Sequence, residues 1–536
     1  MTHPLSGLEP DRAGHSALRS LAASLAILVA MVVVAAGTFV SAADRPWVEV
    51  KSPHFTAISD AGEKSARRVA WQFEQVRAVL LRLWPWARVS SGKPVMVFAA
   101  RDEATLKTLV PKYWEQKGGM RPASVFVTGR DRHFVALRTD TAEPDSVEAN
   151  PYFQTYWSYV YLVLPASFAM DLPPWYARGL ADFFANTIVR NKDVQVGRIV
   201  PWHLTELRQT SMLPLSTLFG VDQQSPYLTR DVDSRLFDAS AWALVHYLTL
   251  GERGANLSKF NRFSTAMRAS RDPVAALREV YGDLAALERE VRSYTAKNLF
   301  AYQSFGIDVD VSSEGFALRP LQTAENATAR AALHAAMNRP VDARALVDAA
   351  KKADPTLSSV YDSDGLVCDI EGRKDEALAA YSKAVELGTG NFYAHYRHAQ
   401  LSWRQNADAP TLRAIEKSLE RAIALNADYA PAYSFLADTK VSLSAADVAE
   451  PLARRAVSLE PTASYHHTTL AWVLVRLSKR DEAVREAQTA LSLARNAAER
   501  QRAQSLLDYL SRKMSRGRPT EYAPEPPRPT RDGPPQ

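Results

Sequence analysis

Residues 150–187 read NPYFQTYWSYVYLVLPASFAMDLPPWYARGLADFFANT, and this stretch decides the fold of the first half of the chain. Apolar and aromatic residues recur at helical spacing up to Pro165, which ends the pattern. A second apolar pattern begins after Pro173 and Pro174 and continues past Gly179. The stretch therefore predicts two helices joined by a turn that prolines mark.

The second predicted helix has the frame of a known peptidase family. In the peptidase MA-like gluzincins, which are zinc metallopeptidases, one helix carries HExxH and the next carries a segment close to W-x-x-E-G-x-A-[ED]. Residues 174–182 read PWYARGLAD and resemble that segment. The matching positions are Pro174, Trp175, Gly179, Leu180, Ala181 and Asp182. The resemblance implies an α+β metallopeptidase-like domain over residues 44–300.

The residues that would hold the metal are replaced. A catalytic zinc site needs two histidines one helical turn apart, a carboxylate and an open position for water. The resemblance places the histidine positions at Trp157 and Tyr161. It places the general-base glutamate at Ser158 and the third ligand at Arg178. An indole only donates, arginine is a permanent cation and serine is a poor base, so we expect no metal and no other cofactor.

Two interpretations of this degenerate site stay open. Trp157 and Tyr161, four residues apart, would fill the volume of the zinc and its imidazoles, and Arg178 would stack on Trp157 and pair with Asp182. Such a cluster either repairs the core or forms a cleft for a carboxylate ligand. Ser158 lacks the G-x-S-x-G turn of serine hydrolases. The alternatives are two ordinary core helices with an aromatic stripe, or a divergent peptidase or hydrolase with an unrecognised site.

The first 43 residues predict a signal peptide or a membrane anchor. Arg12 and Arg19 precede an uncharged run over residues 21–40, and three small residues follow it. We therefore expect the rest of the chain in a bacterial periplasm, either free or anchored to the inner membrane and facing the periplasm. The single cysteine, Cys368, cannot form an internal disulfide, so packing alone must hold the fold.

Composition narrows the classes of partner. The chain has 536 residues, too many for one core, and a net charge of +6 that is mild for this length. Lysine and arginine are spread along the sequence and no nucleic-acid motif accompanies them. We expect no nucleic-acid partner.

The second half of the sequence has an internal period. Small residues recur at separations of 34, 38, 34 and 34, and a 34-residue period with small residues at helix crossings is typical of tetratricopeptide (TPR) repeats. Residues 325–512 resemble that family, which implies an all-α solenoid of about five repeats with a concave groove for a protein or peptide partner. The positions expected to pack between helices are Ala350, Tyr381, Ala384, Leu419, Ala422, Ala456 and Ala490.

The remaining segments complete the predicted organisation. Residues 301–324 are expected to form a linker, and residues 513–536 a disordered, proline-rich tail. The predicted function is that of a non-catalytic pseudopeptidase with TPR repeats that mediates protein–protein interaction in the cell envelope. A plain structural envelope protein without a specific partner is a further alternative.

Overall fold

The computed structural model describes residues 46–115, 117–118, 121–142, 149–251, 256–306, 315–404 and 406–515. The predicted leader, residues 1–43, and the chain beyond residue 515 lie outside the described residues. The described residues from Trp47 onward belong to one compact unit. In those ranges, no helix is both long and apolar enough to cross a membrane.

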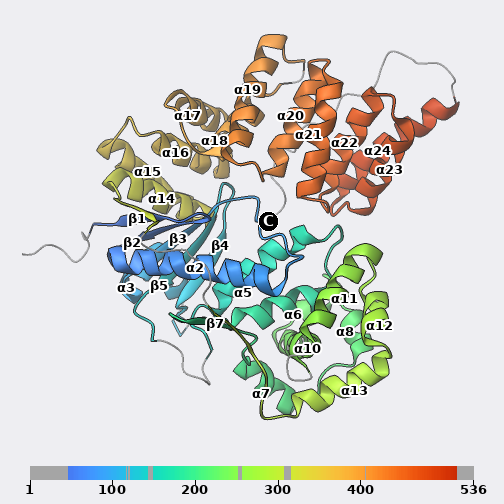
Figure 1. Cartoon of the computed structure of the whole chain (residues 1–536). Helices are drawn as coiled ribbons and strands as arrows, with labels where there is room; N and C mark the ends of the chain where they lie inside the picture. The colour runs from blue at the N-terminus through green and yellow to red at the C-terminus, as the bar shows by residue number, and fades with distance from the viewer. Residues whose placement is uncertain are drawn as a thin grey trace, which may run out of the picture. The chain divides into compact units, whose positions relative to one another are not determined.

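A six-stranded mixed sheet forms one layer of the first half (Figure 1). Its strands, in spatial order, are β4 (Ser124–Thr128), β5 (His133–Arg138), β3 (Val95–Ala100), β2 (Phe55–Ser59), β1 (Val48–Lys51) and β9 (Ala317–Pro320). β2, β3 and β5 run parallel, with Phe55 opposite Val95 and Val95 opposite His133. The outer pairs are antiparallel. All six residues of β3 are buried, because both faces of the sheet are covered.

Alternate residues of β3 serve two different cores. Val97 lies in a core with Phe73 of the long helix α2 (Glu63–Leu83). Phe98 lies in a second core with Leu106 of α3 (Glu103–Leu109) and Leu333 of α14 (Thr323–Ala336). A short helix, α4 (Lys112–Glu115), follows α3. The second core thus joins the sheet to the first helix of the C-terminal half.

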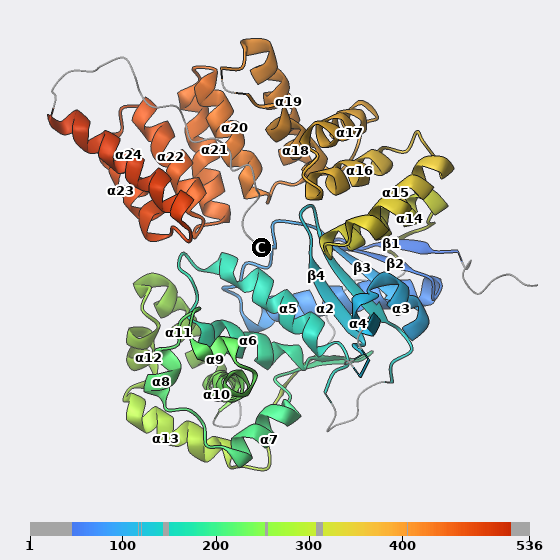
Figure 2. The same cartoon turned by 180° about the vertical axis from the view of Figure 1, so that it is seen from behind.

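Residues 150–187 fold as two helices, as their sequence predicts (Figure 2). The first is α5 (Phe153–Val163), which passes into the 3-10 helix η1 (Leu164–Ser167). The second is α6 (Pro174–Ala185), which begins at a proline because the first helical position needs no N–H donor. Helix α10 (Asp231–Leu250) packs against α6. A Cβ atom on Gly179 would lie 2.6 Å from the Ala241 carbonyl oxygen, so only glycine permits this approach.

A small sheet and further helices complete the first half. Its strands are β6 (Ile188–Val189), β7 (Asp193–Val196) and β8 (Gln303–Gly306), paired antiparallel in that order. The helices are α7 (Pro201–Gln209), α8 (Leu215–Phe219), α9 (Pro226–Thr229), α11 (Leu257–Ser270), α12 (Pro273–Tyr281) and α13 (Leu284–Thr295). Residues 301–324, expected as a linker, supply β8 to this sheet and β9 to the larger one.

The C-terminal half is an all-α solenoid of helix pairs (Figure 1). The first helices of the pairs are α14, α16 (Ser358–Ile370), α18 (Phe392–Ser402), α20 (Ala430–Ser442) and α22 (Ser464–Arg476). The second helices are α15 (Pro340–Ala353), α17 (Lys374–Glu386), α19 (Ala409–Leu425), α21 (Ala446–Leu459) and α23 (Arg480–Ser492), and α24 (Ala497–Ser515) follows them. Each pair packs on the next, which is the arrangement of a TPR solenoid.

The turn inside each pair repeats the period of the sequence. Asn338, Gly372, Asn406, Ser444 and Ser478 all have a positive φ, between 57° and 77°. The one longer interval, from Asn406 to Ser444, contains α19, which has 17 residues where α17 has 13. The extra residues therefore lengthen one helix by a turn and leave the stacking intact.

The positions expected to pack between helices all lie on second helices of the pairs. Their side chains are between 0% and 1% exposed: Ala350, Tyr381, Ala384, Leu419, Ala422, Ala456 and Ala490. Tyr381 packs directly against Gly365 of α16, where an added Cβ atom would lie 2.7 Å from the Tyr381 ring. Glycine at that position lets α16 and α17 pack closely.

Candidate functional site

Three of the residues that the family resemblance assigns to the zinc positions come together between α5 and α6. The rings of Trp157 and Tyr161 stack, with centroids 4.8 Å apart and planes 10° from parallel. The Arg178 guanidinium carbon lies 5.6 Å from the centre of the Trp157 ring. Ser158 lies between the two aromatic residues on α5 and is half-buried. A stacked aromatic pair under a cation thus occupies the place that the family resemblance assigns to the metal.

Arg178 pairs with Asp238 of α10. The expected pairing of Arg178 with Asp182 is therefore wrong. Arg178 donates from Nε and Nη2 to the two Asp238 carboxylate oxygens, at 2.5 and 2.6 Å. A two-pronged pair of this kind matches the planar guanidinium best. Asp238 reaches it from a facing helix, whereas Asp182 lies one turn further along α6 and turns toward the core. The cation is therefore already neutralised within the fold.

Asp182 has a different partner, His203 of α7. The Asp182 Oδ1 and His203 Nε2 atoms are 3.3 Å apart, and both side chains are about 95% buried. Burial raises the pKa of the Asp182 carboxyl, while the neighbouring His203 charge acts in the opposite direction. In the described part of the chain, no group of three or more His, Cys, Asp or Glu side chains is arranged to hold a metal ion.

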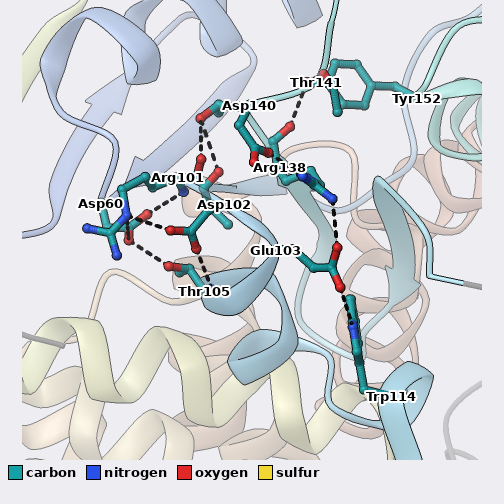
Figure 3. Close-up of polar contacts among 12 residues, drawn as sticks. Asp60, Arg101, Asp102, Glu103, Thr105, Trp114, Arg138, Asp140, Thr141 and Tyr152 are labelled. Carbon is teal, nitrogen blue, oxygen red and sulfur yellow. Dashed lines mark hydrogen bonds and ion pairs between the residues drawn. The ribbon is translucent and has the colours of Figure 1, made fainter. Parts of the chain in front are cut away.

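The carboxyl ends of the parallel strands, a frequent ligand site in α/β proteins, are closed by polar contacts (Figure 3). Asp60, after β2, accepts from the Arg101 backbone N–H at 2.7 Å and from Thr105 Oγ1 at 3.0 Å. Asp102 caps α3 by accepting from the Thr105 N–H at 2.8 Å, which lowers the pKa of its carboxyl. The hydrogen bonds of these side chains hold the ends of the strands and the start of α3.

A second part of the same network extends from β5 (Figure 3). Arg138 donates to Asp140 at 2.6 and 2.8 Å and to Glu103 at 3.1 Å. Trp114 Nε1 also donates to Glu103, and Tyr152 donates to the Arg138 carbonyl at 2.8 Å. The bond from Arg138 lowers the pKa of Asp140. Every charge named here has a partner inside the network, so its role is to fix the loops.

The clearest polypeptide contact lies on the solenoid. We call the face formed by α14, α16, α18, α20 and α22, their preceding turns and the last turn of α21 the inner face. We call residues 88–93 and 129–132 the two basic loops. From the first basic loop, Arg88 donates to the Ser458 carbonyl at 2.5 Å. Ser90 Oγ donates to Asp428 at 2.9 Å, and Asn426 donates to the Gly92 carbonyl at 2.9 Å. The solenoid thus binds this loop through both its backbone and its side chains.

The second basic loop, the turn between β4 and β5, contacts the inner face at α16 and α18. Arg130 lies 3.7 Å from the Asp369 carboxylate, which is 2% exposed and also pairs with the buried Arg397. Asn391 Nδ2 lies 3.5 Å from Asp131 Oδ2. Lys93 Nζ donates to the Gly129 carbonyl at 3.0 Å and so ties the two basic loops together.

A polar cavity of about 160 Å³ lies beside this contact. Asp131 and Arg132 line it from the sheet, and Asp362 and Asn391 line it from the solenoid. Thr389 donates to Asp362 at 2.8 Å, and burial raises the pKa of that carboxyl to about 7. Buried polar side chains therefore line part of the contact between the sheet and the solenoid.

An apolar core holds the same contact from beneath. Phe98 and Phe134 of the sheet belong to one core with Leu366, Phe392 and Phe435 of the solenoid. The first helices of the solenoid are thus attached firmly to the sheet. The groove that the sequence predicts is partly occupied by the chain itself.

Comparison with known proteins adds the following. No family model and no curated protein matches the chain. Solved structures are similar over about a third of the chain. One is YrrB, a TPR protein with an unusual peptide-binding site, at 18% identity over 34% of this chain and 92% of that chain, with a TM-score of 0.29. MamA is similar at 24% identity over 30% and 93%, with a TM-score of 0.27. A thermophilic TPR protein of Thermus thermophilus, TTC0263, is similar at 21% identity over 34% and 98%, with a TM-score of 0.27.

Sequence reasoning missed Asp238, His203 and the basic loops. Asp238 follows from the packing of two helices, because Gly179 contacts Ala241 and Val245 only once the chain has folded. Residue 238 lies one turn earlier on the same face of α10 and so meets α6 near Arg178. His203 and the loop contacts have no signal in the sequence either, since they depend on how separate elements meet.

Proposed function

We propose that this chain is a non-catalytic, exported scaffold protein that binds a protein partner through its solenoid and carries a degenerate gluzincin-like domain. One observation supports the binding role above the others. The solenoid already holds the first basic loop by hydrogen bonds to a loop carbonyl and to loop side chains, and it meets the second through Arg130 and Asp131. A surface that binds backbone and side chains of its own chain has the chemistry to bind those of another.

The proposal that the first half does no hydrolysis rests on residue chemistry. An indole and a phenol stack where the histidines would stand, and the guanidinium in the third position is paired with Asp238. None of these groups supplies a lone pair suited to zinc beside a free base. Zinc analysis of protein purified without added metal tests this directly. We expect far less than one zinc per chain, and one zinc per chain would support the divergent peptidase instead.

Export rests on the pattern of the first 43 residues and on the single cysteine. Fractionation of cells that make the chain, with mass determination of the mature N-terminus, tests it. We expect the chain in the envelope fraction, with an N-terminus near residue 44 if the leader is cleaved. A cytoplasmic chain would contradict export.

Crosslinking capture from the native cell tests the binding role. Asp428 and Glu460 are 50% and 44% exposed at the inner face, so the variant D428K/E460K should fold. Its two lysines reverse the charge of the surface that binds the loops and should therefore weaken partner binding there. The matched control E376K/E386K makes the same charge change on α17, where both carboxylates are at least 60% exposed. We expect a specific partner to be lost from D428K/E460K and kept by the control. Equal capture by all three chains would remove the solenoid from the function.

A further inference from the structure

We propose that the inner face selects a basic, turn-forming segment of its protein partner, and that the two basic loops occupy this place in the free chain. The inference rests on the proposed function and names the chemistry of the partner. It follows from what the chain itself puts on this surface. The occupant is two turns that each present cations, and the solenoid meets them with the Asp369 carboxylate and the Ser458 carbonyl.

Charge complementarity is the first argument. The loops bring Arg88 and Arg130 to acceptors on the solenoid, whereas Lys93 donates to the Gly129 carbonyl of the second basic loop. Arg130 faces the Asp369 carboxylate at 3.7 Å, and Arg88 binds the Ser458 carbonyl. Burial lowers the pKa of Lys93, while the carboxylates Asp131 and Glu460 act to raise it. Opposite charges placed across an interface steer the correct partner and exclude acidic ones.

Aromatic lining is the second argument. Tyr393, Tyr396 and Tyr429 are 5–9% exposed on or beside α18, and the rings of Tyr396 and Tyr429 meet edge to face at 5.1 Å. The nearby Arg130 charge works against the burial that raises the pKa of Tyr393 to about 12. Ring faces carry partial negative charge and attract cations. Tyr393 thus lies within electrostatic range of Arg130, the cation that occupies this face in the free chain.

The exposed cations of the loops are held weakly enough to be displaced, whereas the buried Val89, Gly129 and Asp131 keep the loop backbones in place. Arg130 has a side chain that is 40% exposed, and its ion pair at 3.7 Å is longer than a hydrogen bond. Ser90 and Asp428 meet at an exposed edge. The apolar core beneath, with Phe98 and Leu366, keeps the sheet and the solenoid attached when these side chains are displaced. A partner segment thus competes with the side chains of Arg88 and Arg130 and not with a whole domain.

A labelled peptide tests the inference on the full chain. The probe is WARVSSGKPV, residues 86–95, which carries Arg88 and Lys93, and its control peptide has glutamate at both positions. The chain variant R88A/R130A weakens the loops' hold, and both arginines are exposed, so folding should survive. The variant R88Q/R130Q removes the same two charges but keeps longer side chains, so it repeats the test with less loss of side-chain volume. Fluorescence anisotropy measures binding of both peptides.

We expect R88A/R130A to bind the basic peptide at least about tenfold more tightly than the unaltered chain does, with binding weakened by salt. D428K/E460K should lose binding of the basic peptide, because its two lysines repel the cations of that peptide. Equal binding of the basic and the acidic peptide, or no binding of the basic peptide to R88A/R130A and R88Q/R130Q, would overturn the inference. If partner capture still depends on Asp428 and Glu460 in that case, the scaffold function stands and only the basic partner is wrong.

Discussion

Replacing Arg178 with alanine separates core repair from ligand binding in the cluster of α5, α6 and α10. The change removes two charge-assisted hydrogen bonds and leaves Asp238, whose side chain is 19% exposed, without its cation. Hydrogen bonds to charged groups contribute about 1.5–3 kcal/mol, and the contact with the Trp157 ring contributes about 0.5–1 kcal/mol. Water reaches Asp238, so the loss should stay below the roughly 3–5 kcal/mol of a fully buried pair. We expect R178A to lower the free energy of unfolding by about 2–3 kcal/mol.

A double-mutant cycle checks this magnitude. Urea unfolding of the unaltered chain, R178A, D238A and R178A/D238A, followed by tryptophan fluorescence, gives the coupling energy between the two side chains. We expect a coupling of about 1.5–2.5 kcal/mol, with partner capture unchanged in all four chains. A coupling below about 0.5 kcal/mol would show that the pair does not form. Lost partner binding with stability intact would show that Arg178 serves a ligand and would refute core repair.

Three further changes test other parts of the fold by denaturation. G179A should lower the free energy of unfolding by about 1–3 kcal/mol, because its Cβ would lie 2.6 Å from a carbonyl oxygen of α10. The control G220A should not lower it, because Gly220 has a φ of −83° and a Cβ there would lie 3.4 Å from its nearest atom. Similar losses in both variants would contradict the close helix contact. Burial raises the pKa of Asp438 from 3.8 to about 7, so the folded chain keeps a proton that the unfolded chain releases, and stability falls as the pH rises from about 4 to 7. D438N should therefore gain about 1–3 kcal/mol relative to the unaltered chain at pH 8 and little at pH 4, and parallel pH curves would rule this out. S478G should raise the free energy of unfolding by about 0.5–1 kcal/mol, because Ser478 holds a φ of 60° that glycine adopts freely, and a loss would show that its side chain matters more.

The helices were predictable because their causes are local. Proline positions and helical spacing predicted α5 and α6, and a 34-residue period predicted the solenoid. The residues 301–324 show the opposite case. Strands β8 and β9 are four residues each and become stable only through partners far away in the sequence, so their own pattern indicated a linker.

The candidate site was predictable only in part, for the same reason. Trp157 and Tyr161 are four residues apart on one helix, so their stacking follows from helix geometry. The partner of Arg178 lies 60 residues away, and helix spacing alone pointed to Asp182. Ser90 and Asp428, which contact each other, are 338 residues apart in the sequence, and no local pattern predicts their contact.

The central claim is that the inner face of the solenoid is a polypeptide-binding surface occupied by the chain's own basic loops. Cysteines at Ser90 and Asp428, whose side chains meet at 2.9 Å, test it in solution with dibromobimane, a reagent that fluoresces only after it links two thiols. The single native cysteine, Cys368, is 2% exposed and should not react. We predict that monomeric S90C/D428C becomes fluorescent, whereas S90C alone stays dark. A dark S90C/D428C would contradict the claim.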